Sequence, residues 1–124
     1  ERFVAAMQSP HVDCIGHLTG RRLSRRRGAE VDVERVVARA AETGTALEIN
    51  AQPARLDLDD RLGREALDAG ALFSIASDAH DPEGFELLRH GVLQARRAWI
   101  PAGRVVNTLP LAALRTALAA TRGP

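Results

Sequence analysis

Along the chain, short apolar runs alternate with segments whose apolar residues recur at helical spacing. The first pattern predicts strands and the second predicts helices. Three short apolar runs, at residues 12–17, 46–50 and 72–76, have the length of strands. Apolar residues between these runs recur at helical spacing, from Asp32 as N-cap to Gly44 and from about residue 59 to a stop at Gly70. Each strand and helix pair takes roughly 25 to 35 residues, so the sequence predicts an α/β fold with parallel strands.

The other segments are predicted to be mainly helical. Residues 1–7 read as the end of a helix, and residues 82–88, 91–98 and 110–121 as further helical stretches. The run at residues 72–76 contains a single serine, which predicts a strand buried on both faces. Cys14 is expected to face the core as a small apolar residue. Because the chain begins without Met and its first residues read as the end of a helix, we expect a fragment of a longer protein.

Polar residues gather where the predicted strands end. His17 follows the first strand, Asn50 ends the second, and Asp78 and His80 follow the third. In barrels and open parallel sheets, the loops at the carboxyl ends of the strands converge on one site. The sequence therefore predicts a functional site at this edge of the sheet.

Asp78 and His80 form the main candidate pair of metal ligands. They stand two residues apart after an apolar strand, and an extended backbone would point both side chains the same way. A carboxylate with imidazoles suits Zn²⁺, Mn²⁺ or Fe²⁺, and His17 would supply a third ligand, the minimum for catalytic zinc. The alternative is that Asp78 caps the next helix while both histidines are structural.

Three further polar residues surround this candidate site. Glu48 and Asn50 share one face of the second predicted strand, where they could orient the ligands or, alternatively, serve only the sheet and its loop. Arg55 lies just beyond the same strand and is placed to hold a substrate phosphate. A salt bridge from Arg55 to Asp57 or Asp59 is the competing interpretation.

Charge changes this picture only locally. All 17 basic residues are arginine, and with 16 acidic residues the net charge is +1, so the chain is not a general polycation. Five of the arginines fall within residues 21–27, in the loop after His17. Such a run attracts a nucleic-acid backbone, although a solvated, mobile loop is the usual alternative. The loop has no aromatic residue, so stacking of single-stranded bases is not expected there.

Several function classes are excluded by composition. A single cysteine rules out an internal disulfide and any zinc site built from several cysteines, and it favours a reducing, cytoplasmic setting. No apolar run approaches the ~20 residues that span a membrane. No Gly-rich phosphate loop or serine nucleophile motif is present, so nucleophilic catalysis by the protein is poorly supported.

Six short blocks in series resemble one protein family. In order and spacing over residues 12–109 they resemble the PHP (polymerase and histidinol phosphatase) domain that ends the bacterial family X DNA polymerases. The blocks are Gly16-His17-Leu18-Thr19-Gly20-Arg21, Ala46-Leu47-Glu48-Ile49-Asn50-Ala51, Arg55-Leu56-Asp57-Leu58, Ser77-Asp78-Ala79-His80, Ala95-Arg96-Arg97-Ala98-Trp99 and Val106-Asn107-Thr108-Leu109.

The resemblance implies that residues 1–124 are the C-terminal portion of a distorted (βα)7 barrel whose N-terminal part is absent. It implies a metal-dependent phosphoesterase with up to three Zn or Mn ions. The implied activity is 3′–5′ exonuclease or DNA-end processing, attached to a polymerase. The family's last three metal ligands fall on His17, Asp78 and His80, and the last two would be catalytic. Arg21 and Arg55 would bind the substrate phosphate.

Two other functions stay open beside this one. The first is a stand-alone PHP phosphatase such as histidinol-phosphatase, although the Arg-Leu-Asp-Leu and Ala-Arg-Arg-Ala-Trp blocks favour the polymerase-linked type. The second is a non-catalytic structural or DNA-binding module of the polymerase. Half a barrel would leave strand edges unpaired, so we also expect self-association of the fragment, which size-exclusion chromatography would test.

Overall fold

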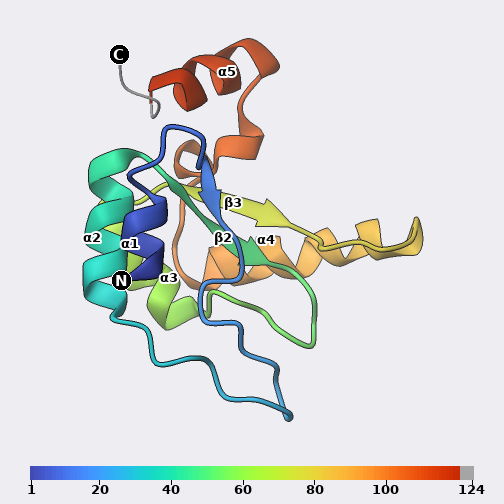
Figure 1. The fold of residues 1–124 in the computed structure, drawn as a ribbon. Helices are drawn as coiled ribbons and strands as arrows, with labels where there is room; N and C mark the ends of the chain where they lie inside the picture. Colours follow the sequence, from blue (N-terminus) through green and yellow to red (C-terminus); the bar gives the residue numbers. More distant parts are fainter. Residues whose placement is uncertain (121–124) are drawn as a thin grey trace.

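The sheet at the centre of the protein has three parallel strands in chain order. The computed structural model describes residues 1–120, and Figure 1 shows strands β1 (Cys14–Ile15), β2 (Ala46–Asn50) and β3 (Phe73–Ala76). β2 is central, because it pairs in parallel with both β1 and β3. The predicted α/β fold with parallel strands is confirmed. A (βα)7 barrel is not shown, because the strands within residues 1–120 form an open sheet, and the barrel stays a prediction.

Local capping signals set the bounds of two helices. α2 (Val33–Thr43) begins after Asp32, whose side chain accepts a hydrogen bond from the first turn, and it ends at Gly44, whose φ of 72° is left-handed. α3 (Asp60–Asp68) begins after Asp59, which caps it in the same way. Both helices lie where the sequence predicts them, because side-chain caps and a left-handed glycine act within a few residues.

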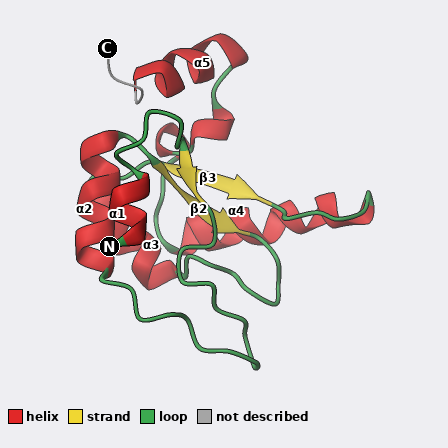
Figure 2. Cartoon of the chain, in the orientation of Figure 1, coloured by secondary structure: helices red, strands yellow, loops and turns green. Residues whose placement is uncertain are grey.

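The remaining helices surround the sheet and extend the chain beyond it. Figure 2 shows α1, α2 and α3 together beside the sheet and α5 apart from it, while α4 packs against β2 and β3. The stretch predicted as a helix at residues 82–88 is a 3₁₀ helix. The last predicted helix, residues 110–121, corresponds to α5, and its predicted end at Thr121 lies outside the described residues. These elements are α1 (Arg2–Ala6), η1 (Glu83–Leu87), α4 (Leu88–Arg97), η2 (Ala102–Arg104), η3 (Val106–Thr108) and α5 (Leu111–Ala120).

The core lies between the sheet and the neighbouring helices. Leu47, Ile49 and Phe73 of the sheet are almost completely buried, and the apolar stripe predicted on α2 supplies Val36 and Val37. Burying an aliphatic or aromatic side chain of this size contributes about 1.5–3 kcal/mol. The packed strands therefore give a rigid base for the loops at their carboxyl ends.

Two predictions about the direction of side chains are wrong. Cys14 is exposed while Ile15 is buried, because successive strand residues point to opposite faces and the larger isoleucine takes the core side. β3 is not buried on both faces: Phe73 is buried, whereas Ser74, Ile75 and Ala76 are only half-buried. The reason is that β3 lies at an edge of the sheet.

The outer edge of β3 is covered by a side chain in place of a fourth strand. Asn107 Nδ2 donates to the Ile75 carbonyl oxygen at 2.8 Å, and Asn107 Oδ1 accepts from the Ile75 backbone N–H at 3.1 Å. Val105 forms a single parallel bridge with Phe73. These contacts satisfy backbone groups that an edge strand would otherwise present to a neighbouring chain. The predicted self-association of the chain stays a prediction.

The contact between α4 and the sheet depends on Gly91. An alanine Cβ there would lie 2.5 Å from Ile75 Cγ2 and 3.0 Å from Ala51 Cβ. We expect Gly91→Ala to lower the free energy of unfolding by about 1–2 kcal/mol, because overpacking outweighs the gain in helix propensity. Urea denaturation measures this, with Gly103→Ala as control, since a Cβ at Gly103 meets no atom within 4 Å. Equal stability of the two variants would contradict the close packing.

Candidate active site

An open cleft lies at the carboxyl ends of the strands. Its volume is about 390 Å³, and the three predicted metal ligands His17, Asp78 and His80 all contribute to its walls. These residues come from the loops after β1 and β3, and Arg55 joins them from the loop after β2. The other lining residues are Arg22, Gln52 and Ala54. Side chains far apart in the sequence thus meet at one edge of the sheet.

The donor types in this cleft fit a divalent metal, but their arrangement supplies only part of a ligand shell. Two imidazoles and a carboxylate suit Zn²⁺ or Mn²⁺. Within residues 1–120, however, no three His, Cys, Asp or Glu side chains form a group that could hold a metal ion. A metal bound here would therefore need additional ligands or a rearrangement of these three.

Asp78 is the centre of a hydrogen-bond network. Its Oδ2 accepts from Asn50 Nδ2 at 3.2 Å and lies 3.8 Å from Arg55 Nε. Its backbone carbonyl oxygen accepts from Gln52 Nε2 at 3.0 Å and lies 2.7 Å from His80 Nδ1. A carbonyl can only accept, so His80 Nδ1 carries the proton of that bond. In the neutral imidazole this leaves the lone pair of His80 Nε2 free for a metal or a proton.

The backbone at two of the predicted ligands is strained. His17 has a φ of 30° and Asp78 a φ of 54°, in the region that non-glycine residues rarely adopt. The extended geometry predicted for residues 78–80 is therefore wrong, because the chain turns at Asp78. Each such residue costs on the order of 1–3 kcal/mol, and strain of this kind clusters at functional sites.

Glu48 and Asn50 hold these strained residues in place. Glu48 Oε2 accepts from the His17 backbone N–H at 2.5 Å and lies 3.5 Å from Asn50 Nδ2. Asn50 is only 1% exposed, and besides contacting Asp78 its Oδ1 accepts from the Gln52 backbone N–H at 3.1 Å. The two polar residues of β2 thus link the loops after all three strands.

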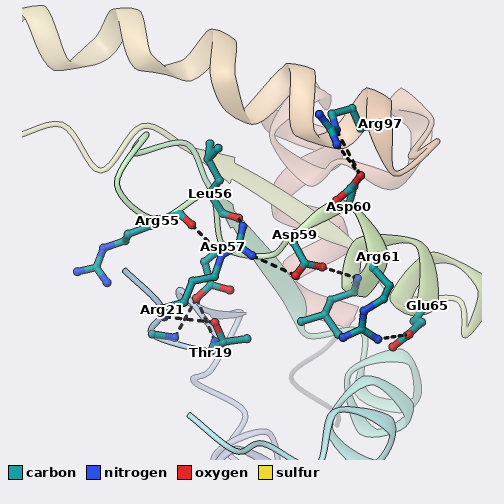
Figure 3. Close-up of polar contacts among 12 residues, drawn as sticks. Thr19, Arg21, Arg55, Leu56, Asp57, Asp59, Asp60, Arg61, Glu65 and Arg97 are labelled. Atoms are coloured by element: carbon teal, nitrogen blue, oxygen red, sulfur yellow. Dashed lines mark hydrogen bonds and ion pairs between the residues drawn. The ribbon is translucent and has the colours of Figure 1, made fainter. Parts of the chain in front are cut away.

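Arg21 lies outside the cleft and holds the loop after β2 (Figure 3). Its Nε donates to the Arg55 carbonyl oxygen at 2.8 Å, its Nη1 to Asp59 Oδ2 at 3.1 Å, and its Nη2 to the Leu56 carbonyl oxygen. This position gives no support to the predicted contact between Arg21 and a substrate phosphate. Arg55, by contrast, pairs with Asp78 rather than with the predicted Asp57 or Asp59, and it lines the cleft.

Asp57 is a central residue that sequence reasoning missed. It is 0% exposed, and its Oδ2 accepts from the backbone N–H groups of Thr19 at 3.0 Å and Gly20 at 2.9 Å. Its carbonyl oxygen also accepts from the Asn50 backbone N–H at 2.5 Å. Asp57 therefore fastens the loop that carries His17 to the loop that carries Arg55. In the sequence, the only sign that Asp57 is buried is its position between Leu56 and Leu58.

Cys14 of β1 and Asp60 of α3 have shifted pKa values. Cys14 is exposed as a residue, yet burial of its thiol raises the pKa to about 11, with smaller contributions from the carboxylates of Glu48 and Asp13. A thiol with this pKa is protonated at neutral pH and is a poor metal ligand.

On α3, a hydrogen bond from the Arg97 guanidinium lowers the pKa of the Asp60 carboxyl and ties α4 to the start of α3 (Figure 3).

Comparison with known proteins identifies a relative. No protein-family model matches the chain. The chain is 40% identical over 111 residues, 90% of its length, to the DNA polymerase/3′–5′ exonuclease PolX of Bacillus subtilis (strain 168). It spans about 20% of the length of that protein. The predicted resemblance to the family X DNA polymerases is therefore confirmed, and the chain is a relative of one segment of PolX.

Proposed function

We propose that residues 1–124 are the C-terminal portion of a metal-dependent PHP phosphoesterase domain attached to a family X DNA polymerase. The domain would act on DNA in the cytoplasm, as a 3′–5′ exonuclease or in DNA-end processing. The observation that carries this proposal is the shared cleft of His17, Asp78, His80 and Arg55 at the strand ends. The relative is named a DNA polymerase/3′–5′ exonuclease, which supports the choice of DNA as substrate.

In this proposal the cleft residues divide into two roles. His17, Asp78 and His80 would hold Zn²⁺ or Mn²⁺, with His80 binding through Nε2. When bound, such an ion lowers the pKa of a water molecule and offsets the charge of the attacked phosphodiester. Arg55 would hold a phosphate oxygen, since a guanidinium donates two hydrogen bonds in a plane. The rest of the ligand shell would come from the longer protein.

The non-catalytic module is the second candidate, because the described residues contain no complete group of metal ligands. In that case the cleft would serve only to join the loops or to bind DNA. A stand-alone phosphatase such as histidinol-phosphatase is less favoured, since the identity of 40% is to a polymerase-linked protein. Loss of activity on mutation of the cleft separates the first two functions.

His80→Ala in the full-length protein tests the proposal. We expect the rate of nucleotide removal from a 5′-labelled oligonucleotide in Mn²⁺ to fall at least about tenfold, because even residues that only orient metal ligands cost 10- to 100-fold. His11→Ala is the matched control, since His11 is exposed and does not line the cleft. A wild-type rate for His80→Ala would favour the non-catalytic module.

A further inference from the structure

The arginine-rich loop between β1 and α2 contains a hydrogen-bonded turn at residues 22–26. Arg22 and Arg26 exchange backbone hydrogen bonds of 2.9 and 2.8 Å, which close the turn. The Leu23 backbone N–H donates to the Ala54 carbonyl oxygen at 2.7 Å and fastens the turn to the loop after β2. Two sets of backbone hydrogen bonds therefore give residues 22–26 a defined shape, although the loop is exposed to solvent.

The five arginines of this loop fall into two groups. The side chains of Arg21 and Arg26 are held by hydrogen bonds within the protein. Arg21 donates to the loop after β2, and the exposed Arg26 donates from Nη2 to the Gly20 carbonyl oxygen at 2.5 Å. Arg22, Arg25 and Arg27 are exposed, and their guanidinium groups make no hydrogen bond or ion pair with the described part of the chain. No acidic residue occurs between Asp13 and Glu30, so no carboxylate of the loop itself offsets these three charges.

The exposed arginines lead into the cleft. Arg22 lines the cleft together with Arg55 and His80, and it also lines the hollow of about 450 Å³ formed by residues 21–28. Arg25 and Arg27 border that hollow. Positive charge therefore continues from the loop to the candidate catalytic residues, although the whole chain carries a net charge of only +1.

We propose that Arg22, Arg25 and Arg27 form a track for the phosphodiester backbone of the DNA strand whose end enters the cleft. This inference rests on the proposed function and adds the surface that holds the strand. Arginine binds phosphate through two donors, and the loop has no aromatic side chain on which a base could stack. The track therefore binds DNA without regard to sequence, and each contact releases counterions.

The salt dependence of DNA binding tests the track. In full-length protein carrying His80→Ala, to prevent degradation, the affinity for a labelled single strand is measured at several salt concentrations. Adding Arg22→Ala, Arg25→Ala and Arg27→Ala should lower the slope of log affinity against log salt by about 2, since each single-strand contact contributes ~0.7. Replacing the same three residues by lysine should retain most of the slope.

A matched variant removes the same charge elsewhere. Arg35, Arg89 and Arg115 are exposed and lie outside the loop, so changing all three to alanine should leave the slope within error. If the loop variant keeps the wild-type slope, or the control variant loses as much, the track is wrong. The proposed function has its own test: it fails if the protein with His80 intact releases no nucleotides from the same strand. Even then, the salt dependence of DNA binding still decides whether the three arginines form the track.

Discussion

Replacing Asp78 by asparagine should lower the rate of phosphodiester hydrolysis by the full-length protein at least about 100-fold. The substitution keeps the size of the side chain but removes the charge that would bind a divalent ion and that lies 3.8 Å from Arg55 Nε. Residues that merely orient metal ligands cost 10- to 100-fold, so a ligand should cost more. Nucleotide release from a labelled strand under saturating Mn²⁺ measures the effect.

The control for this variant is Asp68→Asn on α3. Asp68 is exposed, pairs with Arg64 at the surface and does not line the cleft. Its replacement should leave the hydrolysis rate within about twofold, because surface ion pairs contribute little. Circular dichroism should show both variants folded. A folded Asp78→Asn protein with more than a third of the wild-type rate would remove Asp78 from the catalytic residues.

Asp57→Ala should lower the free energy of unfolding by about 3 kcal/mol. The buried carboxylate accepts hydrogen bonds from the backbone N–H groups of Thr19 and Gly20, and hydrogen bonds to charged groups contribute about 1.5–3 kcal/mol each. Alanine would leave the Thr19 N–H without an acceptor, while the Gly20 N–H would keep only its bond of 2.8 Å to the His17 carbonyl oxygen. Urea denaturation gives the value, provided that the slope with denaturant is unchanged.

Asp57→Asn separates the charge from the shape of this side chain. Its amide oxygen can still accept from Thr19 and Gly20, while its amide group can take the place of Oδ1, which has no partner among the described residues. We therefore expect roughly half the loss seen for alanine, because neutral hydrogen bonds are weaker than charged ones. If Asp57→Ala is as stable as wild type, the two loops are not joined through this carboxylate.

The parts of the fold that the sequence predicts well depend on local signals. Asp32 and Gly44 cap α2 through contacts within a few residues, so its bounds could be read from the chain. The face of β1 could not, because a strand of two residues has no alternation to read, and Cys14 was placed in the core although it is exposed. Burial of β3 was overestimated because edge position depends on which strands pair.

The candidate site shows the same division. The position of His17, Asp78 and His80 after strands was visible in the sequence, since parallel strands bring their carboxyl ends together. The left-handed turn at Asp78 was not visible, because its contacts come from Asn50 at the end of β2 and from Gln52 in the loop after it. The roles of Arg21 and Asp57 are likewise set by partners more than thirty residues away.

The position of a bound metal ion provides the most direct test of the proposed ligands His17, Asp78 and His80. Crystals of the full-length protein grown with Zn²⁺, with diffraction data collected at the zinc absorption edge, would locate any bound ion by its anomalous signal. We expect an ion about 2.0–2.2 Å from His80 Nε2 and from an Asp78 carboxylate oxygen, with His17 as a further ligand. An ion bound only at other side chains, with these three residues uncoordinated, would contradict this expectation.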